Sequence, residues 1–148
     1  MTDQSIYRAV LLDHFHNPRN KGDLGDMQIV RRGSNPRCGD EIEIGINCEN
    51  NTLESVRFRG RGCSICLASA SLMTESARGL KLTQARDLIE KMQLWFGDQG
   101  GVGPPGMGLA ALGSVRQHPA RKKCVLLAWQ ALDEILDEIE RHPEIVGA

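Results

Sequence analysis

The sequence predicts an α+β fold: a three-stranded antiparallel sheet packed against several helices, in a single compact domain over residues 1–148. Three observations predict this class. One segment alternates apolar and polar residues, which is typical of a strand with one buried face. Turn-forming residues separate it from two further strand candidates. Three other segments repeat apolar residues at helical spacing and a fourth is rich in small and apolar residues, and a chain of 148 residues is long enough for one hydrophobic core.

The first predicted helix covers residues 4–15, where apolar side chains recur at helical spacing. Asn17-Pro-Arg-Asn20 ends it, because proline cannot continue a helix. His14 and His16 lie at this helix end. We interpret both as histidines in solvent or on the helix dipole rather than as metal ligands.

Three strand candidates follow, at residues 27–32, 41–48 and 55–59. In the second, Ile42, Ile44 and Ile46 share one face, so the sequence indicates an antiparallel sheet with one buried side. Cys48 is in phase with these isoleucines. We therefore expect it to be a small core residue rather than a ligand.

Three more helices are predicted at residues 64–78, 83–96 and 119–141. Residues 97–108 contain six glycines and two prolines, which argues against a long regular element there. The sequence therefore predicts that residues 97–115 are a flexible Gly/Pro-rich insertion. A phosphate-binding loop is the alternative, but neither a Gly-Lys-Ser/Thr signature nor a preceding strand supports it.

The composition excludes several functional classes. Lys and Arg number 18 against 19 Asp and Glu, which does not suit nucleic-acid binding through bulk positive charge. Aromatic residues are too few for a base-stacking platform. No apolar run reaches the roughly 18 residues of a membrane-spanning helix, and the N-terminus lacks the features of a secretory signal. We expect a cytoplasmic protein with no nucleic acid and no membrane among its partners.

The five cysteines are the residues most indicative of function. An odd number of cysteines cannot all pair in disulfide bonds within one chain. Thiols also stay reduced in the cytoplasm, so metal binding or thiol reactivity is favoured. Cys63 follows a strand and two glycines and begins a helix, where the helix dipole favours its thiolate. Cys38-Gly-Asp40 can turn a thiolate and a carboxylate toward one ion. Cys124 lies near the start of the last helix, where we expect the same dipole effect.

Cys63-Ser-Ile-Cys66 leaves other interpretations open. It matches a thioredoxin-like redox pair, but that motif belongs in a βαβ context. It also matches half of a zinc knuckle, but the sequence has no second CxxC to complete one. Cys66 can reach the same site as Cys63 or pack as a small core residue, and we favour packing.

Four motifs resemble a known family when taken together, in the right order and over nearly the whole chain. They resemble the iron–sulfur cluster assembly scaffold family, which comprises IscU, SufU and the NifU N-terminal domain. The motifs are Asn17-Pro-Arg-Asn20, Pro36-Arg-Cys38-Gly-Asp40, Gly62-Cys63-Ser-Ile with Ala68-Ser-Ala-Ser71, and Pro119-Ala-Arg-Lys-Lys-Cys124.

The resemblance implies a site. It assigns metal binding to Cys38, Asp40, Cys63 and Cys124, and cluster binding to the three cysteines. It favours the SufU-like branch, because Lys123 stands where the IscU branch carries histidine and because of the insertion before the last cysteine. Cys66 departs from the Ser or Ala usual in the family.

The resemblance also implies a function. We expect a scaffold or sulfur acceptor, rather than a turnover enzyme, that takes persulfide sulfur from a cysteine desulfurase of the SufS or IscS type. Cys38 and Cys124 are the candidate acceptors. The expected cofactors are zinc, a [2Fe–2S] cluster or both, and the expected recipients are apo iron–sulfur proteins or a carrier. The alternatives are a zinc-stabilised adaptor that activates the desulfurase and a CxxC thiol–disulfide oxidoreductase.

Overall fold

The computed structural model describes residues 3–97 and 103–147. Its three strands form one antiparallel sheet in the order β1-β2-β3, which confirms the predicted fold class. Within the described residues, two 3-10 helices accompany four α-helices. The elements are α1 (Asp3–His16), β1 (Ile29–Asn35), β2 (Asp40–Glu49), β3 (Thr52–Arg61), α2 (Ser64–Ala77), α3 (Leu82–Gly97), η1 (Met107–Val115), α4 (Pro119–Arg141) and η2 (Pro143–Val146).

The sheet forms because β2 pairs with both neighbours through tight connections. Ile44 lies opposite Arg31 on β1 and opposite Phe58 on β3. The predicted alternation is confirmed, since Ile42, Ile44 and Ile46 are all fully buried. Burying one such side chain contributes about 1.5–3 kcal/mol, so this face fixes the register of the sheet.

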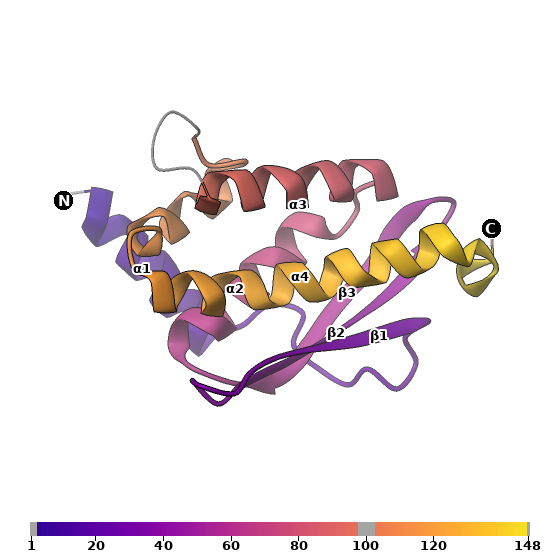
Figure 1. The fold of residues 1–148 in the computed structure, drawn as a ribbon, viewed down its shortest axis with the longest axis horizontal. Helices are drawn as coiled ribbons and strands as arrows, with labels where there is room; N and C mark the ends of the chain where they lie inside the picture. The colour runs from indigo at the N-terminus through magenta and orange to yellow at the C-terminus, as the bar shows by residue number, and fades with distance from the viewer. Residues whose placement is uncertain (1–2, 98–102, 148) are drawn as a thin grey trace.

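The helices lie in two layers over that face (Figure 1). Helices α2 and α4 contact each other and the sheet, and α3 packs against α4 on the side away from the strands. In α4, Val125, Trp129 and Leu132 are fully buried. The consequence for the site is that the first turns of α2 and α4 lie at the same end of the sheet as the β1–β2 turn, at the left of Figure 1.

Two serines tie α2 to its neighbours. Ser71 Oγ lies 2.7 Å from His14 Nδ1 and accepts the Arg19 backbone N–H at 2.8 Å. Ser69 Oγ donates to the Val125 carbonyl at 2.7 Å and accepts the Trp129 indole N–H at 3.1 Å. Within the Ala-Ser-Ala-Ser run of α2, the serines are therefore buried connectors.

The structure corrects two sequence interpretations. His14 is buried rather than in solvent, because Ser71 supplies a polar partner for its ring. Within the segment predicted to be a flexible insertion, Met107–Val115 forms a 3-10 helix. Its Leu109 and Leu112 are buried, so hydrophobic packing orders this part despite the glycines. Residues 98–102 of the predicted insertion lie outside the described residues.

Candidate metal centre

The β1–β2 turn supplies the first two candidate ligands. Residues 36–39 form the turn, with the Cys38 N–H donating to the Asn35 carbonyl at 3.1 Å. Gly39 has a φ of +70°, a conformation that side chains with a β-carbon resist. This turn leaves the Cys38 side chain exposed while Asp40, the first residue of β2, is only 1% exposed.

Asp40 is held against the start of α2. Its Oδ1 accepts the Cys63 N–H at 2.9 Å, and its Oδ2 lies 4.0 Å from Cys63 Sγ. Gly62 makes this approach possible, because a β-carbon there would lie 2.8 Å from Asp40 Oδ1 and 3.2 Å from Cys66 Sγ. The carboxylate is thus positioned by backbone contacts before any metal binds.

Cys63 is the N-cap of α2, as the sequence predicted. Its Sγ accepts the Cys66 N–H at 3.4 Å, a capping contact that satisfies one of the free N–H groups of the first turn. The helix N-terminus is also where a thiolate is favoured. The side chain is half-buried, between the exposure of Cys38 and that of Cys124.

Cys124 lies in the second turn of α4 and is only 2% exposed. Its Sγ is 3.6 Å from the Ala120 carbonyl. Burial and the neighbouring Asp40 and Cys63 raise the pKa of the Cys124 thiol. This corrects the expectation that the helix dipole makes Cys124 a ready thiolate: the dipole acts within the first turn, whereas burial and neighbouring acidic groups dominate here.

The donors of Cys38, Asp40 and Cys124 form a group whose ligand atoms all lie within 4.8 Å of one another. Ligands of a tetrahedral zinc ion are roughly 3.5–3.8 Å apart, so a small inward movement of these side chains suits such an ion. A cation also fits the charge, because Asp40 and Cys124 place a carboxyl and a thiol close together in a buried position, where a positive ion stabilises their charged forms. Cys63 is adjacent but not part of this group.

Two other cysteines do not join the group. Cys66 is 1% exposed and belongs to the hydrophobic core, and burial raises the pKa of its thiol to about 12. Cys48 is also buried in the core, and burial raises its pKa too, as the sequence interpretation expected of a packing residue. Neither His14 nor His16 is part of the group.

Comparison with known proteins places this geometry in a family. Residues 6–140 match the NifU-like N terminal domain. The chain belongs to this family. A zinc-dependent sulfurtransferase SufU from Bacillus subtilis is 39% identical over 135 residues, covering 88% of each chain. An iron–sulfur cluster assembly scaffold protein IscU from Thermotoga maritima is 31% identical over 141 residues, covering 95% of this chain and 99% of the relative.

A solved structure agrees with the family assignment. The crystal structure of a putative iron–sulfur cluster assembly scaffold protein for the SUF system, from Fervidobacterium islandicum, superposes with a TM-score of 0.79. It is 26% identical and covers 91% of this chain and 99% of its own. The overall fold is therefore shared with this neighbour.

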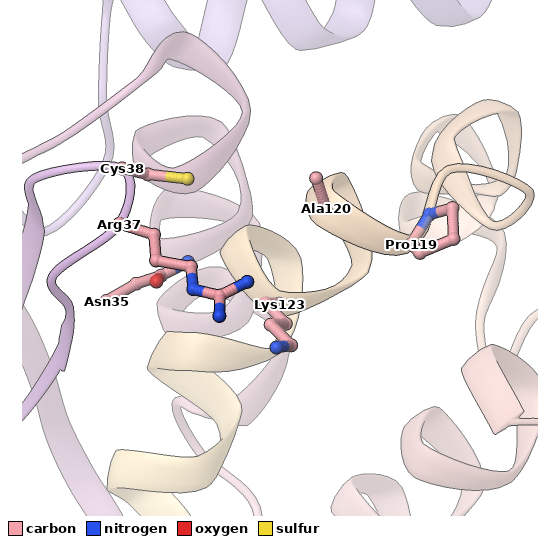
Figure 2. A pocket seen from close by; sticks show the side chains of 6 residues that line it. All are labelled: Asn35, Arg37, Cys38, Pro119, Ala120 and Lys123. Carbon is pink, nitrogen blue, oxygen red and sulfur yellow. The ribbon is translucent and has the colours of Figure 1, made fainter.

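Sequence reasoning missed one feature of this NifU-like domain, a hollow beside Cys38. Figure 2 shows Arg37 and Lys123 directing their side chains into the same space. A partial signal was present, since a basic residue immediately precedes each of Cys38 and Cys124. It could not show that the two cations meet, because they are far apart in the chain.

Proposed function

We propose that this chain takes part in iron–sulfur cluster assembly. It accepts sulfane sulfur from a cysteine desulfurase and binds zinc or a nascent cluster through Cys38, Asp40, Cys63 and Cys124. The observation that carries the proposal is the convergence of Cys38, Asp40 and Cys124 from three separate segments, with ligand atoms within 4.8 Å of one another. The zinc-dependent sulfurtransferase and the scaffold proteins among its relatives support it.

Cys38 is the sulfur acceptor in this proposal, rather than Cys124. A persulfide on a partner protein must reach the attacking sulfur, and Cys38 is exposed whereas Cys124 is 2% exposed. The Cys38 thiolate attacks the terminal sulfur of the donor persulfide. The donor's S–S bond breaks, its cysteine leaves as a thiolate, and Cys38 becomes the persulfide. The reaction needs no external oxidant or reductant.

Asp40 holds the fourth position of the metal site. Carboxylate oxygen binds soft metals less tightly than thiolate does, so Asp40 is the ligand that most readily exchanges. Its Oδ1 bond to the Cys63 N–H keeps it in place when it is not bound to metal. Bound zinc, where present, supplies a positive charge that keeps the thiols of the site deprotonated.

The proposal also includes the cellular location of the protein and its partner proteins. No helix in residues 3–97 and 103–147 combines the length and apolar character needed to cross a membrane. We place the protein in the cytoplasm, with a desulfurase of the SufS or IscS type as donor and apo iron–sulfur proteins or a carrier as recipients. We also infer that residues 1–148 act as one scaffold domain.

A second candidate is a zinc-stabilised adaptor that activates the desulfurase without holding a cluster. The observation that favours it is that Cys124 is part of the hydrophobic core, so a metal there ties core elements together. The oxidoreductase alternative is disfavoured, because a redox-active pair needs an accessible thiol and Cys66 is 1% exposed.

The test is to purify the protein without oxygen and measure its metal and acid-labile sulfide. The same sample then receives a cysteine desulfurase, cysteine and ferrous iron. A persulfide on Cys38 with faster desulfurase turnover supports sulfur acceptance, and sulfide with iron that transfers to an apo-ferredoxin supports cluster assembly. Stimulation by Cys38→Ser equal to that by the wild type, with metal retained, supports the adaptor. No persulfide, no cluster and no stimulation overturn the proposal.

A further inference from the structure

A cavity of about 230 Å³ lies beside the candidate metal centre. The β1–β2 turn forms one wall, and the first turns of α4 form the other (Figure 2). Its lining residues are Asn35, Arg37, Cys38, Pro119, Ala120 and Lys123. Among the four candidate ligands, Cys38 lines this cavity, whereas Asp40, Cys63 and Cys124 do not.

The cavity presents two positive charges without a negative one. Neither Arg37 nor Lys123 forms an ion pair with any described residue. A larger cavity, of about 660 Å³ between α3 and α4, also contains an arginine. There, however, Arg86 is paired with Asp133 and with Asp137. Two unpaired cations that face one space repel each other, and an anion between them relieves that repulsion.

The position of Cys38 in the cavity wall indicates that the anion is a sulfur species. Cys38 is the cysteine that lines the cavity, and it is the exposed one of the candidate ligands. Cys38 thus belongs both to the group with Asp40 and Cys124 and to the wall of the cavity that Arg37 and Lys123 line.

We propose that this cavity receives the terminal sulfur of a persulfide on Cys38, with Arg37 and Lys123 as its counter-charges. This rests on the proposed function, which supplies the persulfide. After transfer, the outermost sulfur carries the negative charge once its proton passes to solvent. The two cations stabilise that charge and hold the sulfur away from the buried ligands until an acceptor removes it.

The first experiment tests the cavity without any desulfurase. The reaction of Cys38 in the full-length protein is timed with a dianionic disulfide, dithiobis-nitrobenzoate, and with neutral dithiodipyridine, with Cys38→Ser as the background. Arg37→Gln and Lys123→Gln should each slow the dianionic reagent about fivefold, the factor expected for unit charges roughly 4 Å apart in water. The neutral reagent should be unaffected, and Arg37→Lys and Lys123→Arg should keep the wild-type rate.

Two lysines serve as matched controls. Lys122 neighbours Lys123 but does not line the cavity, and Lys81 lies at the other end of the sheet, where it pairs with Thr52. Lys122→Gln and Lys81→Gln should change the rate less than twofold. An effect of Lys122→Gln equal to that of Lys123→Gln, or equal slowing of both reagents, overturns the proposal, because a general field or a blocked thiol then explains the data.

The second experiment tests the ligand itself. Wild type and the Arg37→Gln/Lys123→Gln double variant are equilibrated with desulfurase and cysteine, alkylated, and mapped by mass spectrometry. The double variant should carry at least tenfold less persulfide on Cys38 at equilibrium. Equal persulfide in both proteins overturns the inference while the proposed function stands. If the wild type takes no sulfur, the proposed function fails, and this inference about a persulfide fails with it.

Discussion

The turn side and the helix side of the candidate metal centre differ in exposure, backbone conformation and neighbouring charge. On the turn side, Cys38 is exposed, its neighbour Gly39 has a φ of +70°, and Arg37 and Lys123 line the cavity beside it. On the helix side, Cys124 is 2% exposed and belongs to the hydrophobic core, and Cys63 is the N-cap of α2. In the proposed function, this contrast lets Cys38 take up sulfur at the surface while Cys124 keeps its place in the core.

The largest expected effect comes from replacing one cysteine on each side of the site by serine. Cys124→Ser should lower metal affinity at least a hundredfold and destabilise the fold, because it alters the hydrophobic core as well as the ligand set. Cys38→Ser should abolish sulfur acceptance yet melt close to the wild type. Metal content by mass spectrometry and thermal melting measure both effects, and equal loss of stability in the two variants contradicts the asymmetry.

Alanine at each of two glycines should separate an effect on metal binding from an effect on backbone strain. Gly62→Ala should lower metal affinity about tenfold, because the added methyl would lie 2.8 Å from Asp40 Oδ1 and must displace the carboxylate. Gly39→Ala meets no atom within 4 Å and should cost about 1–2 kcal/mol through its positive φ, with metal still bound. Metal titration with a competing chelator, beside urea unfolding, separates the two effects. A larger metal effect for Gly39→Ala goes against this picture.

Ser69→Ala weakens the helix side without touching a ligand. It removes the acceptor of the Trp129 indole N–H and the donor to the Val125 carbonyl, leaving buried polar groups unpaired. We expect a loss of about 1–3 kcal/mol in the free energy of unfolding. Chemical denaturation checks this value, with Ser114→Ala as a control at a less buried serine. Unchanged stability means that water replaces both bonds.

The smallest expected effect is a pH dependence from His14. Burial, together with Arg19, lowers the pKa of its ring, although Glu75 and Asp13 act in the opposite direction. The unfolded state therefore binds the proton more tightly, so the contribution of His14 is fully present above about pH 6.5 and declines as pH falls below it. Unfolding free energies at several pH values should show a steeper acid decline for the wild type than for His14→Gln. Parallel profiles contradict the assignment.

The sequence predicted the fold well where one hydrophobic periodicity extends over a whole element. Residues 119–141 were expected to be helical, and α4 spans Pro119–Arg141, because a long amphipathic pattern leaves little choice. Met107–Val115 was missed as a helix because its glycines argue locally for a loop, whereas Leu109 and Leu112 are ordered by packing that only the folded chain shows.

The site was partly predictable for a related reason. The family resemblance implied Cys38, Asp40, Cys63 and Cys124, and the structure groups the ligand atoms of Cys38, Asp40 and Cys124, with Cys63 beside them. Burial decides their differences, and burial depends on residues distant in sequence. The sequence therefore could not show that Cys38 is exposed while Cys124 has a raised pKa, nor that Arg37 meets Lys123 across a cavity.

The position of Trp129 gives the protein an optical reporter of its own. Its indole is fully buried and hydrogen-bonded to Ser69, about one and a half helical turns from Cys124 on the same helix. A metal bound by Cys124 would shift the first turns of α4 and so change the surroundings of the Trp129 ring. Tryptophan emission should then follow loading and release of the centre in real time, without a label.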